Sequence, residues 1–334
     1  MCIRDSTNPG RRLIEREAAS LTGGTVVLQG LSGRFPDRLR LAHAELRDAD
    51  GVWVGLDRLA LDWSPLRLLS RDAFIDRLDV DALNLARLPA PAPAKPDQPA
   101  KSGSFSLPVR VDVQALHVLR LTLARPVAGV AAVAEITGAA HLASLSQGDG
   151  SVSVTRIDSP GTYKASGRIG PDSLQATLDA AEPPGGLASS VAHLPDLGAL
   201  TLHASLDGPR NAEATVLSLQ AGELRADAHG TLDLADRSAD VEITATAPAM
   251  TPAPGVSWRS VSLQAHTRGP FTAPDATGHL DVAGVSAAGA TLDRLLADVN
   301  GTLGHVALKA SAAGLRIPGP VSYTHLTLPT IYSV

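Results

Sequence analysis

Apolar and polar residues alternate with a period of two along most of this chain. The alternation is clear at residues 52–56, 59–63, 78–85 and 119–123. Successive side chains of a β-strand point to opposite faces of a sheet, so this period predicts strands with one apolar and one polar face. The apolar parity slips between Leu56 and Leu59, which predicts a β-bulge or bend. The pattern therefore predicts a mostly β protein.

Three short segments depart from this period. Arg11–Leu21 has apolar residues on one helical face and is followed by two glycines, which predicts a short helix. Ser64 and Pro65 are typical of the first positions of a helical turn, and we expect the leucines of that turn to plug one end of a sheet. Gly185–Leu194 is a second plausible helix. Helical structure is thus expected to be a minor part of the fold.

Turn residues and prolines divide the chain into segments. Residues 89–104 read PAPAPAKPDQPAKSGS, the composition of an extended linker, which we interpret as a surface spacer. Beyond it, short strand-like runs are separated by Gly, Pro, Asp and Asn, as in all-β folds. The predicted organisation is a helix at 7–24, an N-terminal β unit at 25–88, the linker at 89–104 and repeated β segments at 105–320.

The two ends of the chain are related at the level of DNA. Residues 1–6 can be encoded by ATG TGT ATA AGA GAC AG, and the reverse complement of that string encodes residues 321–325. This inverted pair resembles a transposon end used to fragment DNA for sequencing. We therefore expect residues 1–6 and 321–334 to be adapter-derived and exclude them from the interpretation of the fold.

The residue composition excludes several kinds of catalytic, metal-binding and nucleic-acid-binding site. Residues 7–320 contain no cysteine, which excludes disulfides, cysteine metal sites and cysteine nucleophiles. The formal net charge of −5 gives no basic surface for nucleic acid. The chain has no nucleotide-binding loop, serine hydrolase motif or zinc-protease motif. Its histidines are scattered singly, and the aspartates of residues 57–81 lie among arginines without calcium-loop spacing. We expect no enzyme activity, no metal and no cofactor.

The apolar stripe, repeated from strand to strand, needs a cover. Hydrophobic residues make up 44% of the chain but aromatic residues only 3%, which suits a long uniform sheet better than a compact globule. A second sheet would give a sandwich, whereas too few helices are predicted for a helical layer. Alternatively, the sheet curls into an open trough that holds alkyl chains, each buried methylene contributing about 0.8 kcal/mol. Alternation alone does not distinguish trough from sandwich.

Residues in the first quarter of the chain resemble a known family. Gly30–Trp53 begins GLSGRFPDRL and ends LRDADGVW, and Leu59–Leu66 reads LALDWSPL. A strand leading to DWSPL, a helical turn and then an IDRL strand are similar to the N-terminal region of the TamB family, which is related to AsmA-like proteins. The resemblance covers residues 7–88 well. Residues 105–320 resemble the family only as degenerate β repeats.

The resemblance implies a periplasmic β-groove that passes phospholipid between the inner and outer membranes and takes part in outer-membrane protein assembly. It also implies an inner-membrane anchor before residue 7 and a C-terminal domain, beyond residue 320, that contacts a TamA-like barrel. It implies no catalytic residues. It favours an open trough over a closed sandwich.

The hypothesis for this chain is an elongated, curled β-sheet trough that carries phospholipid acyl chains on its concave face. The alternative is a chaperone-like β scaffold that templates outer-membrane barrel strands by β-augmentation without carrying lipid. The candidate lining residues of the trough are Leu59, Leu61, Leu78, Val80, Val109, Val111, Val113, Leu119 and Leu121.

Overall fold

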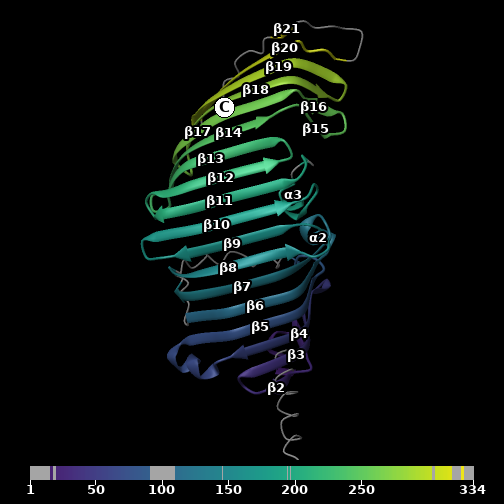
Figure 1. Ribbon diagram of the computed structural model, residues 1–334, viewed down its shortest axis with the longest axis vertical. Helices are drawn as coiled ribbons and strands as arrows, with labels where there is room; N and C mark the ends of the chain where they lie inside the picture. The colour runs from purple at the N-terminus through teal and green to yellow at the C-terminus, as the bar shows by residue number, and fades with distance from the viewer. Residues whose placement is uncertain are drawn as a thin grey trace, which may run out of the picture. The chain divides into compact units, whose positions relative to one another are not determined.

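The computed structural model is mostly β, as the alternation predicts (Figure 1). It divides into two compact units, Met1–Pro171 and Asp172–Val334. Val109, most of the linker and most of the helix expected at 7–24 lie outside the described part of the chain, as do residues 1–6 and most of 321–334. The structure describes residues 16–17, 20–90, 110–144, 146–193, 195, 197–302, 305–317 and 325–326.

Unit 1 is a sheet in which, from β3 onward, each strand pairs with the next strand in the chain. β1 and β2 both pair with β3, and the order continues through β4 to β9. All pairings within the unit are antiparallel except β5–β6, which is parallel. The strands are β1 (Val26–Gln29), β2 (Ser32–Arg34), β3 (Arg38–Asp48), β4 (Gly51–Trp63), β5 (Asp72–Leu85), β6 (Arg110–Leu123), β7 (Ala132–Ser144), β8 (Gln147–Arg156) and β9 (Thr162–Ile169).

The parallel pairing gives the proline–alanine linker a topological role. Asp72 lies opposite Arg110 and Leu85 lies opposite Leu123, so the chain between Leu85 and Arg110 must return along the full length of the strand. Parallel strands need such a crossover, whereas a tight turn suffices for antiparallel ones. A strand of this length spans roughly 45 Å at about 3.3 Å per residue.

The predicted bend in β4 is confirmed, and it continues across the sheet. Arg58 adopts a left-handed φ of 51° between Leu56 and Leu59. Leu59 pairs with Val80, and Leu56 pairs with Leu83, so β5 carries the same three-residue step between apolar positions. On β6 the register to β7 shifts between Val118 and Leu121 and also between Val113 and Leu116. The matched steps return the apolar side chains to the same side of the sheet.

The helical turn after β4 does not plug the sheet, so that expectation is wrong. The 3₁₀-helix η1 (Pro65–Ser70) has no buried residue. Leu66, Leu68 and Leu69 are 80%, 40% and 88% exposed. The helix lies beyond the strand ends, and residues three apart eclipse one another in a 3₁₀-helix, so Leu66 and Leu69 project on the same side.

Unit 2 is an antiparallel sheet in which the strands lie side by side as rungs (Figure 1). A hairpin of β15 (Met250–Ala253) and β16 (Val256–Trp258) interrupts the order, and β16 adds to the end of β18. The short β21 (His325–Leu326) pairs with β20. The main strands are β10 (Ser173–Glu182), β11 (Leu200–Pro209), β12 (Glu213–Ala221), β13 (Leu224–Asp233), β14 (Ser238–Ala247), β17 (Ser260–Pro270), β18 (Asp275–Ala287), β19 (Ala290–Thr302) and β20 (His305–Ala313).

Each unit carries a short α-helix beside its strand ends. In unit 1, α2 (Arg125–Ala128) follows β6 and ends at Gly129, which has a φ of 77°. In unit 2, α3 (Leu187–Val191) connects β10 to β11 and lies within the helix predicted at 185–194.

Candidate functional site

Cross-strand register places the apolar side chains of each unit on one sheet face, which we call the apolar face. Residues directly opposite one another on neighbouring strands point to the same side. In unit 1 one such row is Leu41, Leu59, Val80, Val118, Ile136, Val154 and Tyr163. In unit 2 one row is Leu178, Ala204, Leu217, Ala228, Ile243, Ala265, Gly278, Val299 and Leu308.

The apolar face is partly open to solvent in both units. Leu217, on a central strand of unit 2, is 37% exposed, and Leu178 is 41% exposed. In unit 1, Val152 is 37% exposed. Among the described residues no second sheet covers either face, and neither unit's strands pair into a closed ring. The open sheet expected from the resemblance is therefore present, and the closed sandwich is not.

Burial on the apolar face is greatest beside a short helix at one margin and, in unit 1, also at Leu41, Val80 and Val118 within the row given above, which are 9%, 5% and 4% exposed. In unit 1, Ala128, Ala132 and Ala134 are at most 6% exposed beside α2. In unit 2, Leu200 and Ala221 form a cross-strand row with Glu182 at the strand ends nearest α3 and are each 3% exposed. The helices therefore close one margin of each apolar face and leave most of it half-buried.

Most of the candidate lining residues lie on the apolar face. Leu59 pairs with Val80 and Leu61 with Leu78. On β6, Val111, Val113 and Leu121 lie opposite Ala73, Ile75 and Leu83.

Leu119 is the exception among the described candidates. It is 54% exposed and lies in the step between the paired residues Val118 and Leu121. Val118, only 4% exposed, takes the buried position instead. Sequence reasoning continued a regular alternation through β6 and so missed Leu116 and Val118. The signal that identifies them is the same parity slip that revealed the bend between Leu56 and Leu59.

The opposite face of each sheet carries histidine–carboxylate pairs between strands. In unit 1, His43 Nδ1 lies 2.6 Å from Asp57 Oδ1 and its Nε2 lies 3.0 Å from Glu45 Oε1. Hydrogen bonds raise the pKa of His43, and the bond to Glu45 has a larger effect than the bond to Asp57. The other pairs within 3.5 Å are His117–Glu135, His141 with Asp112 and Asp149, His203–Asp179, His229–Glu242, His266–Asp240 and His279–Asp298.

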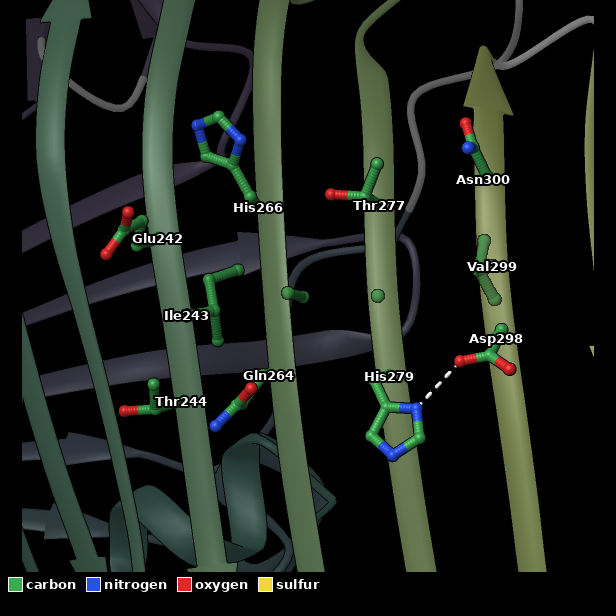
Figure 2. A pocket seen from close by; sticks show the side chains of 12 residues that line it. Glu242, Ile243, Thr244, Gln264, His266, Thr277, His279, Asp298, Val299 and Asn300 are labelled. Carbon is green, nitrogen blue, oxygen red and sulfur yellow. Dashed lines mark hydrogen bonds and ion pairs between the residues drawn. The ribbon is translucent and has the colours of Figure 1, made fainter.

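A hollow of about 620 Å³ in unit 2 lies among these polar side chains (Figure 2). Glu242, His266, Thr277 and Asn300 flank it, and His279 hydrogen-bonds Asp298 across the strands at 2.7 Å. The described residues contain no group of three or more His, Cys, Asp or Glu side chains that could hold a metal ion. The hollow offers hydrogen-bonding groups to a polar ligand.

Comparison with protein families, curated proteins and solved structures found no match for this chain. None of the helices in the described part of the chain is long and apolar enough to cross a membrane.

Proposed function

We propose that the apolar face of each unit binds phospholipid acyl chains. In this proposal the chain is part of a TamB-like, inner-membrane-anchored periplasmic protein, not an enzyme, that passes phospholipid toward the outer membrane. It also takes part in outer-membrane protein assembly with a TamA-like barrel. The observation that carries the proposal is an aliphatic sheet face that no second layer covers among the described residues and that stays partly exposed, apart from the buried Leu41, Val80 and Val118 of unit 1.

The chemistry of the apolar face suits alkyl chains. Its cross-strand rows consist mainly of Leu, Val, Ile, Ala and Gly, which offer dispersion contacts but no hydrogen bonds. Each methylene removed from water contributes about 0.8 kcal/mol, so an acyl chain is held strongly. Because these contacts are not directional, the acyl chain is free to slide along the apolar face. Headgroups remain in water at the margin.

A second function, strand templating without lipid, draws support from the edge of unit 2. Among the described residues, the outer edge of β20 pairs with β21 only at Ala312 and Ala313. Val306 and Leu308 on this strand are 43% and 44% exposed. An edge strand with unpaired backbone groups can accept a strand from another protein.

Charge placed on the apolar face tests the lipid proposal. The double variant Val111→Asp, Leu121→Asp should retain the fold and lose about tenfold or more of its bound phospholipid, because a charge among apolar side chains disfavours alkyl contact. The matched control is Thr122→Asp, Thr137→Asp, which adds the same charge to the polar face, at one position on β6 and one on the neighbouring β7. Phospholipid that co-purifies is quantified by mass spectrometry, and transfer between vesicles is followed by fluorescence.

Unchanged lipid content and transfer in the folded Val111→Asp, Leu121→Asp variant would reject the proposal. A wild-type protein that neither carries nor binds phospholipid would favour strand templating instead.

A further inference from the structure

Three large apolar side chains project from one tip of unit 1. Phe35, in the turn between β2 and β3, is 61% exposed, and Leu66 and Leu69 of η1 are 80% and 88% exposed. Trp63 joins the two turns. Its indole N–H donates to the Pro36 carbonyl oxygen at 2.6 Å, and its backbone N–H donates to the Asp37 backbone carbonyl oxygen at 3.0 Å. Phe35, Leu66 and Leu69 therefore belong to one structure, which we call the apolar tip.

The apolar tip is held in a defined conformation. Backbone hydrogen bonds run from Arg67 to Ser64 at 3.0 Å and from Arg71 to Leu68 at 2.9 Å. The Arg67 guanidinium stacks 3.8 Å over the Phe74 ring and lies 3.5 Å from Asp72. A cation over an aromatic ring fixes a long side chain and covers the ring. The leucines thus stay exposed because a well-bonded turn directs them outward.

Arginines and aspartates both lie behind the apolar tip. A hollow of about 950 Å³ at its base is lined by Pro36, Trp63 and Leu66 together with Arg38, Arg67 and Asp76. Of the three aspartates that line this hollow, Asp37 pairs with Arg34 and Asp62 pairs with Arg40, whereas Asp76 forms no ion pair among the described residues.

Two further cations remain available at the tip. Within the described residues Arg38 and Arg71 form no ion pair. Arg71 directly follows the last turn of η1, and Arg38 begins β3. The arrangement is apolar side chains outermost with cations immediately behind them.

We propose that the apolar tip docks on a phospholipid bilayer surface. Phe35, Leu66 and Leu69 enter the boundary between headgroups and acyl chains, and Arg38 and Arg71 lie at the level of the phosphates. Separate protruding side chains with two arginines behind them match a headgroup layer, in which apolar groups insert and arginines reach phosphate. A flat protein surface would leave the hollow between them unfilled. This docking is independent of lipid carriage on the apolar face.

Vesicle flotation tests the proposal with the full chain. Phosphatidylcholine vesicles are compared with vesicles that also contain phosphatidylglycerol. Leu66→Ser, Leu69→Ser should lower the partition coefficient about tenfold or more, because both inserted apolar side chains are lost. The matched control is Leu88→Ser, Ile157→Ser, which removes two side chains of unit 1 that are 59% and 50% exposed away from the tip. This control should partition within about twofold of wild type.

A second variant separates insertion from phosphate contact. Arg38→Gln, Arg71→Gln should weaken flotation mainly on the anionic vesicles, and added salt should reduce the difference. The folded state of each variant is checked by circular dichroism.

Wild-type flotation retained by the folded Leu66→Ser, Leu69→Ser variant would overturn the proposal, as would failure of the wild type to float on either vesicle. Concentration-dependent self-association that this variant abolishes, without vesicle binding, would assign the tip to a second copy of the chain. Val111→Asp, Leu121→Asp should still float, so bilayer docking and lipid carriage are tested separately.

Discussion

At the residue scale, two buried glutamates show opposite ways of placing a carboxylate near an apolar face. Glu182 is 5% exposed and accepts hydrogen bonds from the backbone N–H groups of Ala188 and Ser189 at 2.7 and 2.8 Å, and from Ser189 Oγ at 2.6 Å. It therefore caps the free N–H groups at the start of α3. Glu213 is 0% exposed, and among the described residues neither of its carboxylate oxygens has a hydrogen-bond partner.

The same substitution at these two sites should have opposite effects. Glu213→Met removes two unsatisfied polar atoms and should raise the free energy of unfolding by about 1–3 kcal/mol. Glu182→Met removes a satisfied cap and should lower it by about the same amount. Urea unfolding measures both values. A destabilised Glu213→Met protein would contradict the assignment of Glu213 as an unsatisfied group.

A raised histidine pKa predicts the pH dependence of unit 1. Glu45 and Asp57 raise the pKa of His43 in the folded state, so the stabilisation from protonated His43 is complete below its unfolded pKa of about 6.5. That stabilisation disappears as pH rises through the higher folded pKa. The melting temperature of wild type should therefore exceed that of His43→Gln most at about pH 6, and the gap should narrow toward about pH 8.5. A difference in melting temperature between wild type and His43→Gln that widens as pH rises would contradict this prediction.

His305→Gln is the control for this measurement. His305 is exposed, and in the described part of the chain it has no carboxylate partner. This control reports the effect of replacing a histidine that lacks a carboxylate partner, and the gap for His43→Gln is compared with it at each pH.

At the element scale, the matched steps in β4, β5 and β6 decide which side chains form the core of unit 1. Val80 lies opposite Val118 on β6, and the two are 5% and 4% exposed. Directly after Val118, the step carries Leu119 and Arg120 into solvent before Leu121 returns to the apolar side. Burial thus differs sharply between adjacent residues.

Adjacent substitutions on β6 test this step. Val118→Ala should lower the free energy of unfolding by about 1–3 kcal/mol, because it removes buried methyl groups next to Val80. Leu119→Ala removes more carbon atoms but should cost less than about 0.5 kcal/mol, because they already face water. Urea denaturation compares the two. The reverse order of costs would place Leu119 on the buried side.

At the scale of the whole molecule, both units share one design: a polar face with histidine–carboxylate pairs and an apolar face that no second layer covers among the described residues. A half-buried apolar face contributes less to stability than a closed core of the same area. A ligand that covers it adds its binding energy to the folded state.

A short-chain phospholipid below its micelle concentration should therefore raise the melting temperature. At a free concentration about 100 times Kd, a single site adds about 2.7 kcal/mol to the stability of the folded state. Differential scanning fluorimetry measures the shift, and Val111→Asp, Leu121→Asp should reduce it. An equal shift in that variant would show that the lipid binds elsewhere.

The sequence by itself determined the strands, their two faces and the bend at Leu56–Leu59. This is possible because the period of two is a local property, readable from neighbouring residues such as Leu59 and Leu61. The same local pattern placed most candidate residues on the correct strand. It failed at Leu119, where a bulge broke the alternation.

Only the tertiary structure decided which strands pair, which face stays open and which polar groups meet. The parallel β5–β6 pairing and the contact of His43 with Asp57 depend on register between separate strands, and the exposure of Leu66 and Leu69 depends on how η1 is held beyond the strand ends. Register is set by bulges and turn geometry summed over the sheet, and a shift of one residue moves every side chain to the other face. No single stretch of this chain contains that information.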